Sequence, residues 1–256
     1  MTDRTRLRVF LVAAAGLAVA LGVGLAGLPR FGSPASTYAD VINALAVPLR
    51  RSTDAVSAVT LDFRGIDTLF EEFILFAAVA GVSILLRPLS DEIGEMPEDQ
   101  APDRRVPPPS PAVGLLGTIL APLLVVAGLE TVTHGQVSPG GGFQGGVVLA
   151  SALFVVYLAT SYSRAERFQP GGLLEASDGA GAGGYVIVGV VGLLAGAAFL
   201  SNTVSLGQPG NLISGGTIPI LNAVVAVEVA GGFVLLAKEF LDQTAVIRQD
   251  RGGRRS

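Results

Sequence analysis

Glu228 is the residue best placed to do chemistry, because it is the one carboxylate in the otherwise apolar run 218–237. A carboxylate near mid-bilayer costs roughly 2.5 to 3.5 kcal/mol on insertion scales and needs a partner or a wet cavity. Burial disfavours the ionised form, so protonated and ionised states are both accessible, as a proton or sodium relay requires. The alternative is a neutral glutamic acid that hydrogen-bonds a neighbouring helix and holds an assembly together.

Two further carboxylates and the only histidine are the other candidates for an ion path. Glu71 and Glu72 stand near the start of the apolar run 69–86. Thr68 and Glu71 have the S/T-x-x-E spacing of a helix capping box, and a capping carboxylate also suits the positive end of the helix dipole. This leaves Glu72 to face a neighbouring subunit or an ion path. His134 should lie close to the outer interface, where its ring either bonds to the adjoining loop or titrates during transport.

A glycine-rich run joins the third and fourth apolar runs. Glycine lacks a Cβ atom, so such a run suits a tight or re-entrant turn packed against other backbone. It is not a phosphate-binding loop, because the G-K-[ST] ending is absent. Two small-xxx-small patterns, Gly142–Gly146–Ala150 and Gly192–Gly196, indicate close helix packing. The predicted packing turn comprises Ser138, Pro139, Gly140, Gly141, Gly142, Phe143, Gln144, Gly145 and Gly146.

Composition removes several classes of function. Of the 256 residues, 50% are hydrophobic and 15% are charged, whereas average soluble domains carry roughly 25% charged residues. Without cysteine there is no disulfide, thiolate metal site or thiol nucleophile, and one histidine cannot build a multi-histidine metal cluster. No basic patch is interleaved with aromatic residues, so nucleic acid is not an expected partner. We therefore expect no cofactor, no resident metal and no enzymatic reaction.

Six apolar runs approach the roughly 20 residues that cross about 30 Å of hydrocarbon. The bilayer interior offers no water to free backbone groups, and continuous apolarity excludes the alternating pattern of a barrel, so all six should be helices. The predicted fold class is therefore all-α, a polytopic integral membrane protein with six transmembrane helices. The runs are 9–28, 69–86, 113–129, 147–162, 185–200 and 218–237.

The distribution of positive charge predicts the orientation. If the six spans alternate in direction, 13 arginine and lysine residues lie on the side of the two termini and 4 on the other side. The positive-inside rule then places both termini in the cytoplasm. The first run follows Arg4, Arg6 and Arg8 and so also resembles a signal peptide, but its apolar core of about 20 residues exceeds the usual 7 to 15. We therefore treat it as a span.

A change of composition divides the chain. Segment 90–111 is acidic, then basic, then proline-rich, which is typical of a cytoplasmic linker. It separates a two-span membrane unit, 1–89, from a four-span membrane domain, 112–245, and a basic cytoplasmic tail follows at 246–256. Between the first two spans, the moderately apolar stretch around 41–61 predicts an interfacial helix.

Several segments resemble a known family. The sequence at 132–150, VTHGQVSPGGGFQGGVVLA, resembles the signature of the MnhB (MrpB) subunit of Mrp-type multisubunit cation/proton antiporters. GGTIPILN at 215–222 and the stretch 228–233 resemble the last span of that subunit, so the likeness covers about residues 112–245. DFRGIDTL at 62–69 is similar to a two-span unit at the C-terminal end of the large MrpA subunit, which is a separate subunit in related membrane-bound hydrogenases.

This resemblance implies a fusion of the two units into one subunit of a multisubunit Na⁺/H⁺ antiporter in the cell membrane. Its partners would be the lipid bilayer and the other Mrp-type subunits, with Na⁺ and H⁺ as the transported ions. The large antiporter-like subunits would carry protons, and this chain would form interfaces and part of the ion path through Glu228, Glu72, Glu71 or His134. Many members have a histidine where Gln136 stands and a lysine near the position of Glu228.

Two other functions remain open from the sequence. One is an accessory membrane subunit of a respiratory or membrane-bound hydrogenase-type ion-pumping complex, in which the same helices would couple electron transfer to ion pumping. The other is a transporter that works alone. Two buried-charge candidates in six helices speak against a self-sufficient transporter.

Overall fold

The computed structural model describes residues 3–28, 37–86, 109–160 and 171–253 of the chain. It divides into two compact units, Met1–Val41 and Ile42–Ser256. The first unit contains α1 (Asp3–Ala26), a long helix whose described side chains are all exposed. A helix that is apolar all round needs an apolar environment, here lipid or other membrane-embedded protein.

Within the described residues, six helices are long and apolar enough to cross a bilayer, which confirms the all-α fold class with six candidate transmembrane helices. Local sequence explains where they begin. At the start of α5, the hydroxyl of Ser110 accepts a hydrogen bond from the backbone N–H of Val113 at 3.4 Å, and a proline occupies the first turn. Besides α1, the spans are α4 (Gly65–Leu86), α5 (Pro111–Thr133), α6 (Gly142–Ala159), α8 (Gly171–Leu194) and α9 (Ile218–Gly253).

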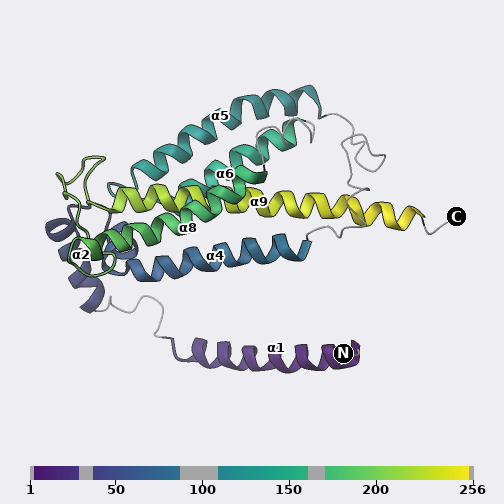
Figure 1. Cartoon of the computed structure of the whole chain (residues 1–256), viewed down its shortest axis with the longest axis horizontal. Helices are drawn as coiled ribbons and strands as arrows, with labels where there is room; N and C mark the ends of the chain where they lie inside the picture. The colour runs from purple at the N-terminus through teal and green to yellow at the C-terminus, as the bar shows by residue number, and fades with distance from the viewer. Residues whose placement is uncertain (1–2, 29–36, 87–108, 161–170, 254–256) are drawn as a thin grey trace. The chain divides into compact units, whose positions relative to one another are not determined.

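Helix α9 is the centre of the second unit (Figure 1). It packs against α4, α6 and α8, whereas α5 packs mainly against α6. Glycines allow close contact: a Cβ atom added to Gly142 of α6 would lie 2.6 Å from the Cβ of Val225, and one added to Gly184 of α8 would lie 3.2 Å from a methyl of Val224. The apolar core that results includes Leu69, Tyr185, Ile218, Leu221, Val225 and Val229.

Short elements and loops pack together at one end of the second unit. Before α4 come α2 (Thr37–Arg50), α3 (Ala55–Ala58) and the π-helical turn η1 (Val59–Phe63). The backbone N–H groups of Thr53 and Asp54 donate to the Gln136 carbonyl at 3.1 and 3.3 Å, and Asn202 Nδ2 donates to Asp62 Oδ2 at 2.8 Å. We call residues 42–63, 134–141 and 195–222, the last of which includes the first turn of α9, the loop layer. They lie at the end where α4, α6 and α9 begin and where α5 and α8 end.

The fifth span differs from its prediction. Helix α8 runs from Gly171 to Leu194, whereas the apolar run predicted 185–200. Its first half contains two acidic residues and many small ones, which look like a polar loop, but packing against α9 keeps this half helical. The span therefore contains charged positions that a hydropathy reading leaves out.

The predicted small-residue face at Gly192 and Gly196 is also wrong. Helix α8 ends at Leu194, and the chain turns at Gly196, whose φ of 76° lies in the left-handed region. Gly192 instead allows the chain to fold back, because a Cβ atom there would lie 2.7 Å from the Ala198 carbonyl oxygen. These glycines therefore shape a turn.

The predicted capping box at the start of α4 is wrong as well. The helix begins at Gly65, three residues before Thr68, so Thr68 lies within the helix and Glu71 cannot be its capping partner. The Thr68 hydroxyl instead donates to the Thr60 carbonyl at 2.7 Å and ties α4 to η1. Glu71 is thereby left without its structural explanation.

Three other predicted segments can be followed only in part. The stretch 41–61 is not one helix but is divided among α2, α3 and η1, and the chain turns at Arg51, whose φ is 56°. Most of the predicted linker, 90–111, lies outside the described residues. In the predicted tail, the backbone of 246–253 continues α9.

Candidate ion path

Glu72 of α4 and Glu228 of α9 meet in the interior of the bundle. Both side chains have 0% exposure. The two carboxyl groups interact directly with each other, so they lie side by side. The two carboxyls lie within hydrogen-bonding reach of each other, and among the described residues neither has another hydrogen-bond partner. Two buried carboxyls this close repel each other when both are ionised, so the pair is suited to hold a proton between α4 and α9.

A glycine on α8 makes room for Glu228. A Cβ atom added to Gly181 would lie 2.2 Å from the Cβ atom of Glu228 and 2.8 Å from its Cα atom. The backbones of α8 and α9 therefore touch at this level. The Glu228 carboxyl reaches beyond this contact to α4, where it meets Glu72.

Asp178 of α8 is a third buried carboxylate. It is 3% exposed, and its Oδ1 atom has no partner among the described residues. Its charge acts on both Glu72 and Glu228. A Cβ atom added to Gly232 of α9 would lie 3.0 Å from Asp178 Oδ1 and 3.1 Å from a methyl of Val79 on α4. Asp178 therefore lies where α4, α8 and α9 meet. We call Glu72, Glu228 and Asp178 the carboxyl row.

Tyr185 lies between the carboxyl row and the loop layer. Its side chain has 0% exposure, and its hydroxyl donates to the Gly65 carbonyl at 2.9 Å. The hydroxyl also lies near Thr68 and Glu72. Polar groups thus continue from Glu72 to the start of α4. At the start of α4, these groups form hydrogen bonds with backbone carbonyls.

Comparison with known proteins identifies the family. Residues 112–235 match the family model described as a domain related to the MnhB subunit of the Na⁺/H⁺ antiporter. An uncharacterized protein of Methanocaldococcus jannaschii is 31% identical over 191 residues, which cover 69% of this chain and 72% of that protein. The chain belongs to the MnhB-related family. Asp178 and Glu228 lie within the segment that matches the family model, and Glu72 lies before it.

Two solved structures share the fold of this MnhB-related chain. One belongs to the membrane-bound sulfane sulfur reductase, an archaeal respiratory membrane complex, with a TM-score of 0.68, 28% identity, and coverage of 94% of this chain and 99% of that chain. The other belongs to the Mrp complex from a Dietzia species, with a TM-score of 0.66, 23% identity, and coverage of 93% and 26%. Together with its six apolar helices, family membership makes the chain a multi-pass protein of the cell membrane.

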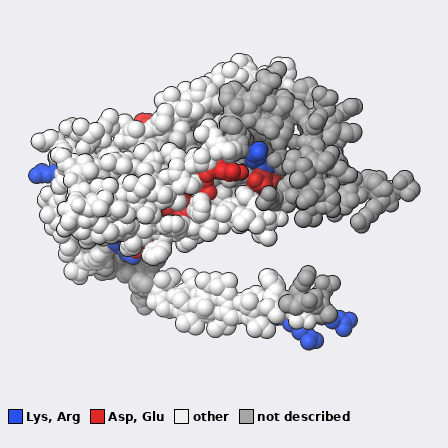
Figure 2. All heavy atoms as spheres, viewed as in Figure 1, with Lys and Arg blue, Asp and Glu red and all other residues white. Residues whose placement is uncertain are grey.

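Glu71 does not belong to the buried pair. Glu71 directly precedes Glu72 on α4, so its side chain points in another direction. It is exposed, as is the side chain of Glu175 on α8. Figure 2 shows that charged atoms are sparse on the viewed face of this MnhB-related chain, and that most of the visible acidic atoms lie across its middle. Charged side chains within spans normally face protein or water. Exposed carboxylates on α4 and α8 therefore suggest surfaces that another subunit covers.

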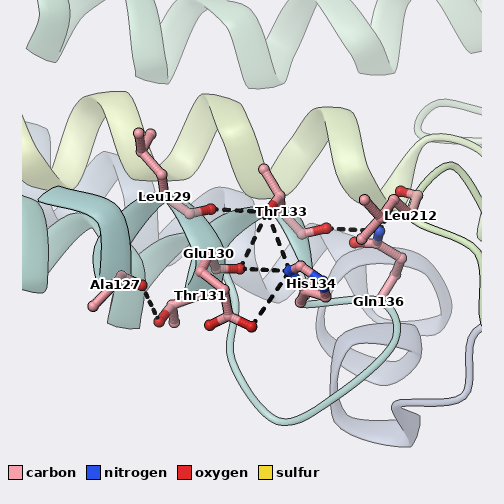
Figure 3. Close-up of polar contacts among 8 residues, drawn as sticks. All are labelled: Ala127, Leu129, Glu130, Thr131, Thr133, His134, Gln136 and Leu212. Carbon is pink, nitrogen blue, oxygen red and sulfur yellow. Dashed lines mark hydrogen bonds and ion pairs between the residues drawn. The ribbon is translucent and has the colours of Figure 1, made fainter. Parts of the chain in front are cut away.

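His134 lies at the end of α5, in the loop layer. Its Nδ1 atom lies 3.1 Å from the Glu130 backbone oxygen and 3.4 Å from the Glu130 carboxylate (Figure 3). In the same view Gln136 Nε2 donates to the backbone carbonyls of Thr133 and Leu212. These contacts make His134 an end group of α5, and the structure does not bring it to the carboxyl row.

The glycine-rich run is divided between the loop layer and α6. Gly141, with a φ of 129°, precedes the helix, and the N–H of Gly142 donates to the side-chain oxygen of Asn222 at 2.8 Å. Phe143 packs against the apolar core, whereas Gln144 is exposed. The run thus places the start of α6 directly against α9.

Sequence reasoning missed Asp178, because the acidic and small residues around it were assigned to a loop. A signal was present in the spacing: Asp178, Gly181 and Tyr185 are three and four residues apart and so share one face of a helix. Among the described residues, no group of three or more His, Cys, Asp or Glu side chains is arranged to hold a metal ion. The three carboxyls are spaced along the helices.

Proposed function

We propose that this chain is a membrane subunit of a multisubunit Na⁺/H⁺ antiporter, and that Glu72 and Glu228 handle the transported ion within it. One observation carries the proposal: two carboxyls with 0% exposure, and with no hydrogen-bond partner among the described residues except each other, meet across two membrane-spanning helices. Ionisable residues inside membranes face partners or cavities and mark ion and proton pathways. Family membership supports the same role.

The pair would work by holding and releasing protons. Two adjacent carboxylates repel each other when both are ionised, so the buried pair retains a proton unless a positive charge replaces it. A monovalent cation that approaches from a neighbouring subunit would supply that charge. The role is transport, with no covalent reaction, and exposed Glu71 would extend the path toward the partner subunit.

A second candidate is a subunit of a respiratory ion-pumping complex. The observation that favours it is the match to a chain of the sulfane sulfur reductase complex, which this chain covers over 99% of its length. Purification in mild detergent followed by mass spectrometry distinguishes the two. Antiporter-like subunits alone support the first role, and redox subunits with Fe–S cysteines support the second.

The test of the proposed role is exchange in membrane vesicles that contain the intact complex. Glu228→Gln and Glu72→Gln should each lower Na⁺-dependent H⁺ exchange about 10-fold or more, because an amide cannot carry the proton. Glu130→Gln is the control, since that carboxylate is exposed at the end of α5. Native electrophoresis checks assembly. Exchange at the parent rate in an assembled Glu228→Gln complex would overturn the proposal.

A further inference from the structure

We propose that Asp178 is the carboxyl through which protons pass between the Glu72–Glu228 pair and the end of the bundle opposite the loop layer. The inference rests on the proposed function, because it assigns the route by which the pair exchanges its protons. It adds a residue on a third helix and a direction. Three features of the structure carry it, namely the order of the groups, their bonding and the position of Ser83.

The order of the groups follows from the face that α4 turns inward. Thr68, Glu72, Val79 and Ser83 are spaced by four, seven and four residues, so they form one stripe along the helix. At 1.5 Å per residue, Val79 lies about 10 Å further along α4 than Glu72, away from the loop layer. The position of a residue along this stripe therefore indicates how far it lies from the loop layer.

Asp178 lies at the Val79 level of this stripe. The site that a Cβ atom on Gly232 would occupy is 3.0 Å from Asp178 Oδ1 and 3.1 Å from Val79. Gly232 is one helical turn beyond Glu228 on α9, which starts at the loop layer. On both α4 and α9, Asp178 is therefore further from the loop layer than the Glu72–Glu228 pair.

Bonding differs between the two sides of the pair. Toward the loop layer, the Tyr185 hydroxyl donates to the Gly65 carbonyl at 2.9 Å and the Thr68 hydroxyl donates to the Thr60 carbonyl at 2.7 Å. Toward the opposite end, Asp178 Oδ1 has no partner among the described residues. Groups whose protons are held by backbone carbonyls are less free to relay than a carboxyl with an unpartnered oxygen, so the easier route leads through Asp178.

Ser83 continues this route. It stands one turn beyond Val79 on the same face of α4, and its Oγ atom is buried and unpartnered within the described part of the chain. A hydroxyl both donates and accepts hydrogen bonds, so it suits a step between Asp178 and water. Leu86, where α4 ends, follows within one turn. The unpartnered oxygens thus extend nearly to the end of the helix.

The proton step needs no other reactant. Protonated Asp178 gives its carboxyl proton to an ionised member of the Glu72–Glu228 pair and becomes a carboxylate. It regains a proton from water at the end of the bundle opposite the loop layer. The reverse sequence releases a proton on that side, which the positive-inside rule predicts to be cytoplasmic.

Thiol labelling tests the direction, and the chain offers a clean background because it has no cysteine. Ser83→Cys is nearly isosteric and Asp178→Cys reports on the carboxyl itself. In the intact complex, both should react with a membrane-impermeant methanethiosulfonate added to the cytoplasmic side and not from the external side. Ala182→Cys is the control: it lies one turn from Asp178 on α8, is 4% exposed, and should stay unlabelled from either side.

Labelling of the Ser83 and Asp178 thiols from the external side, or failure of both to react, would overturn the inference. Exchange measurements separate it from the proposed function. Asp178→Asn should slow Na⁺-dependent exchange about 10-fold or more, and Asp178→Glu should restore most of it, because the carboxyl is retained. If Glu228→Gln abolishes exchange while Asp178→Asn exchanges at the parent rate, only the Asp178 route is wrong. If Glu228→Gln has no effect, the proposed function itself fails.

Discussion

The buried polar groups of the loop layer and those of the carboxyl row differ in how they are bonded. In the loop layer, the hydroxyl of Ser52, with 0% exposure, donates to the Gln136 and Asp54 carbonyls at 2.9 Å each. In the carboxyl row, Glu72 and Glu228 are equally buried, but among the described residues each has only the other carboxyl as a hydrogen-bond partner and none from the backbone. Side chains that are equally buried therefore have a structural role in the loop layer and a different role in the carboxyl row.

The difference shows how to tell structure from function among buried polar residues. A buried group that bonds to backbone fixes a loop, whereas two carboxyls that bond only to each other repel when both are ionised and suit the binding of a proton. The loop layer has exceptions, because Gln136, Asn222 and Ser214 each leave one polar atom unpartnered in the described structure. Those groups are neutral, so leaving them unpaired costs less than leaving an ion unpaired.

The largest expected effect comes from a substitution that closes the space beside the carboxyl row. In Gly181→Ala the new Cβ atom would lie 2.2 Å from the Cβ of Glu228 and 2.8 Å from its Cα, so α8 and α9 must separate. Overpacking of this kind costs about 1 to 3 kcal/mol or more. We expect a clear loss of assembled complex, measured by the yield and thermal midpoint of the purified complex.

Gly179→Ala is the matched control for this substitution. Gly179 lies on the same helix, and a Cβ atom there would meet nothing within 4 Å. Alanine is also the better helix former, so the thermal midpoint should stay or rise. If both variants behaved alike, the close contact between α8 and Glu228 would not be what holds this region together.

A smaller loss is expected in the loop layer. Asn222→Ala removes the side-chain oxygen that accepts the Gly142 N–H at 2.8 Å, at a site that is 2% exposed. Leaving that donor buried and unpaired costs about 1 to 3 kcal/mol. The thermal midpoint of the complex should fall, and exchange per assembled complex should stay at the parent rate.

Thr118→Ala is the control for Asn222→Ala. Its hydroxyl bonds to the Gly114 carbonyl within the same helix and is exposed, so its removal should change the midpoint little. A loss of exchange in well-assembled Asn222→Ala complex would contradict the division between a structural loop layer and a functional carboxyl row.

Much of the fold is accessible from the sequence, because hydrocarbon imposes a simple rule on chain segments. Apolar runs of about 20 residues must be helices, and six such helices are present in the described structure. The rule works for α4, where apolar residues dominate. It is wrong for the bounds of α8, whose first half is built from glycine, alanine, serine and acidic residues.

Some residues of the candidate site can be predicted from the sequence, and others cannot. Glu228 is evident because it interrupts an apolar run, whereas Glu72 is singled out only through a capping box for Glu71 that the structure does not contain. Their meeting across α4 and α9 depends on helix packing, which no single segment encodes. Asp178 was hidden because small residues mimic a loop and become a tight helix surface only when α9 is present.

The smallest expected effect on stability, and the sharpest contrast, comes from neutralising the carboxyl row. Glu72→Gln keeps the volume of a fully buried side chain, and its amide N–H can donate to the Glu228 carboxyl in place of the shared proton. The free energy of unfolding should therefore stay within about 1 kcal/mol of the parent value, which is the scale of one hydrogen bond. For a chain of this size that corresponds to about 2 to 4 °C in thermal midpoint.

The same Glu72→Gln preparation should lose exchange, because the amide cannot carry a proton, whereas Asn222→Ala should lose stability and keep exchange. This opposite pattern is expected if groups that bond to backbone serve the frame and carboxyls that bond only to each other serve transport. A fall in midpoint as large as that of Asn222→Ala would mean that the Glu72 carboxyl does hold a structural bond. The carboxyl row would then belong with the loop layer, as part of the frame of the subunit.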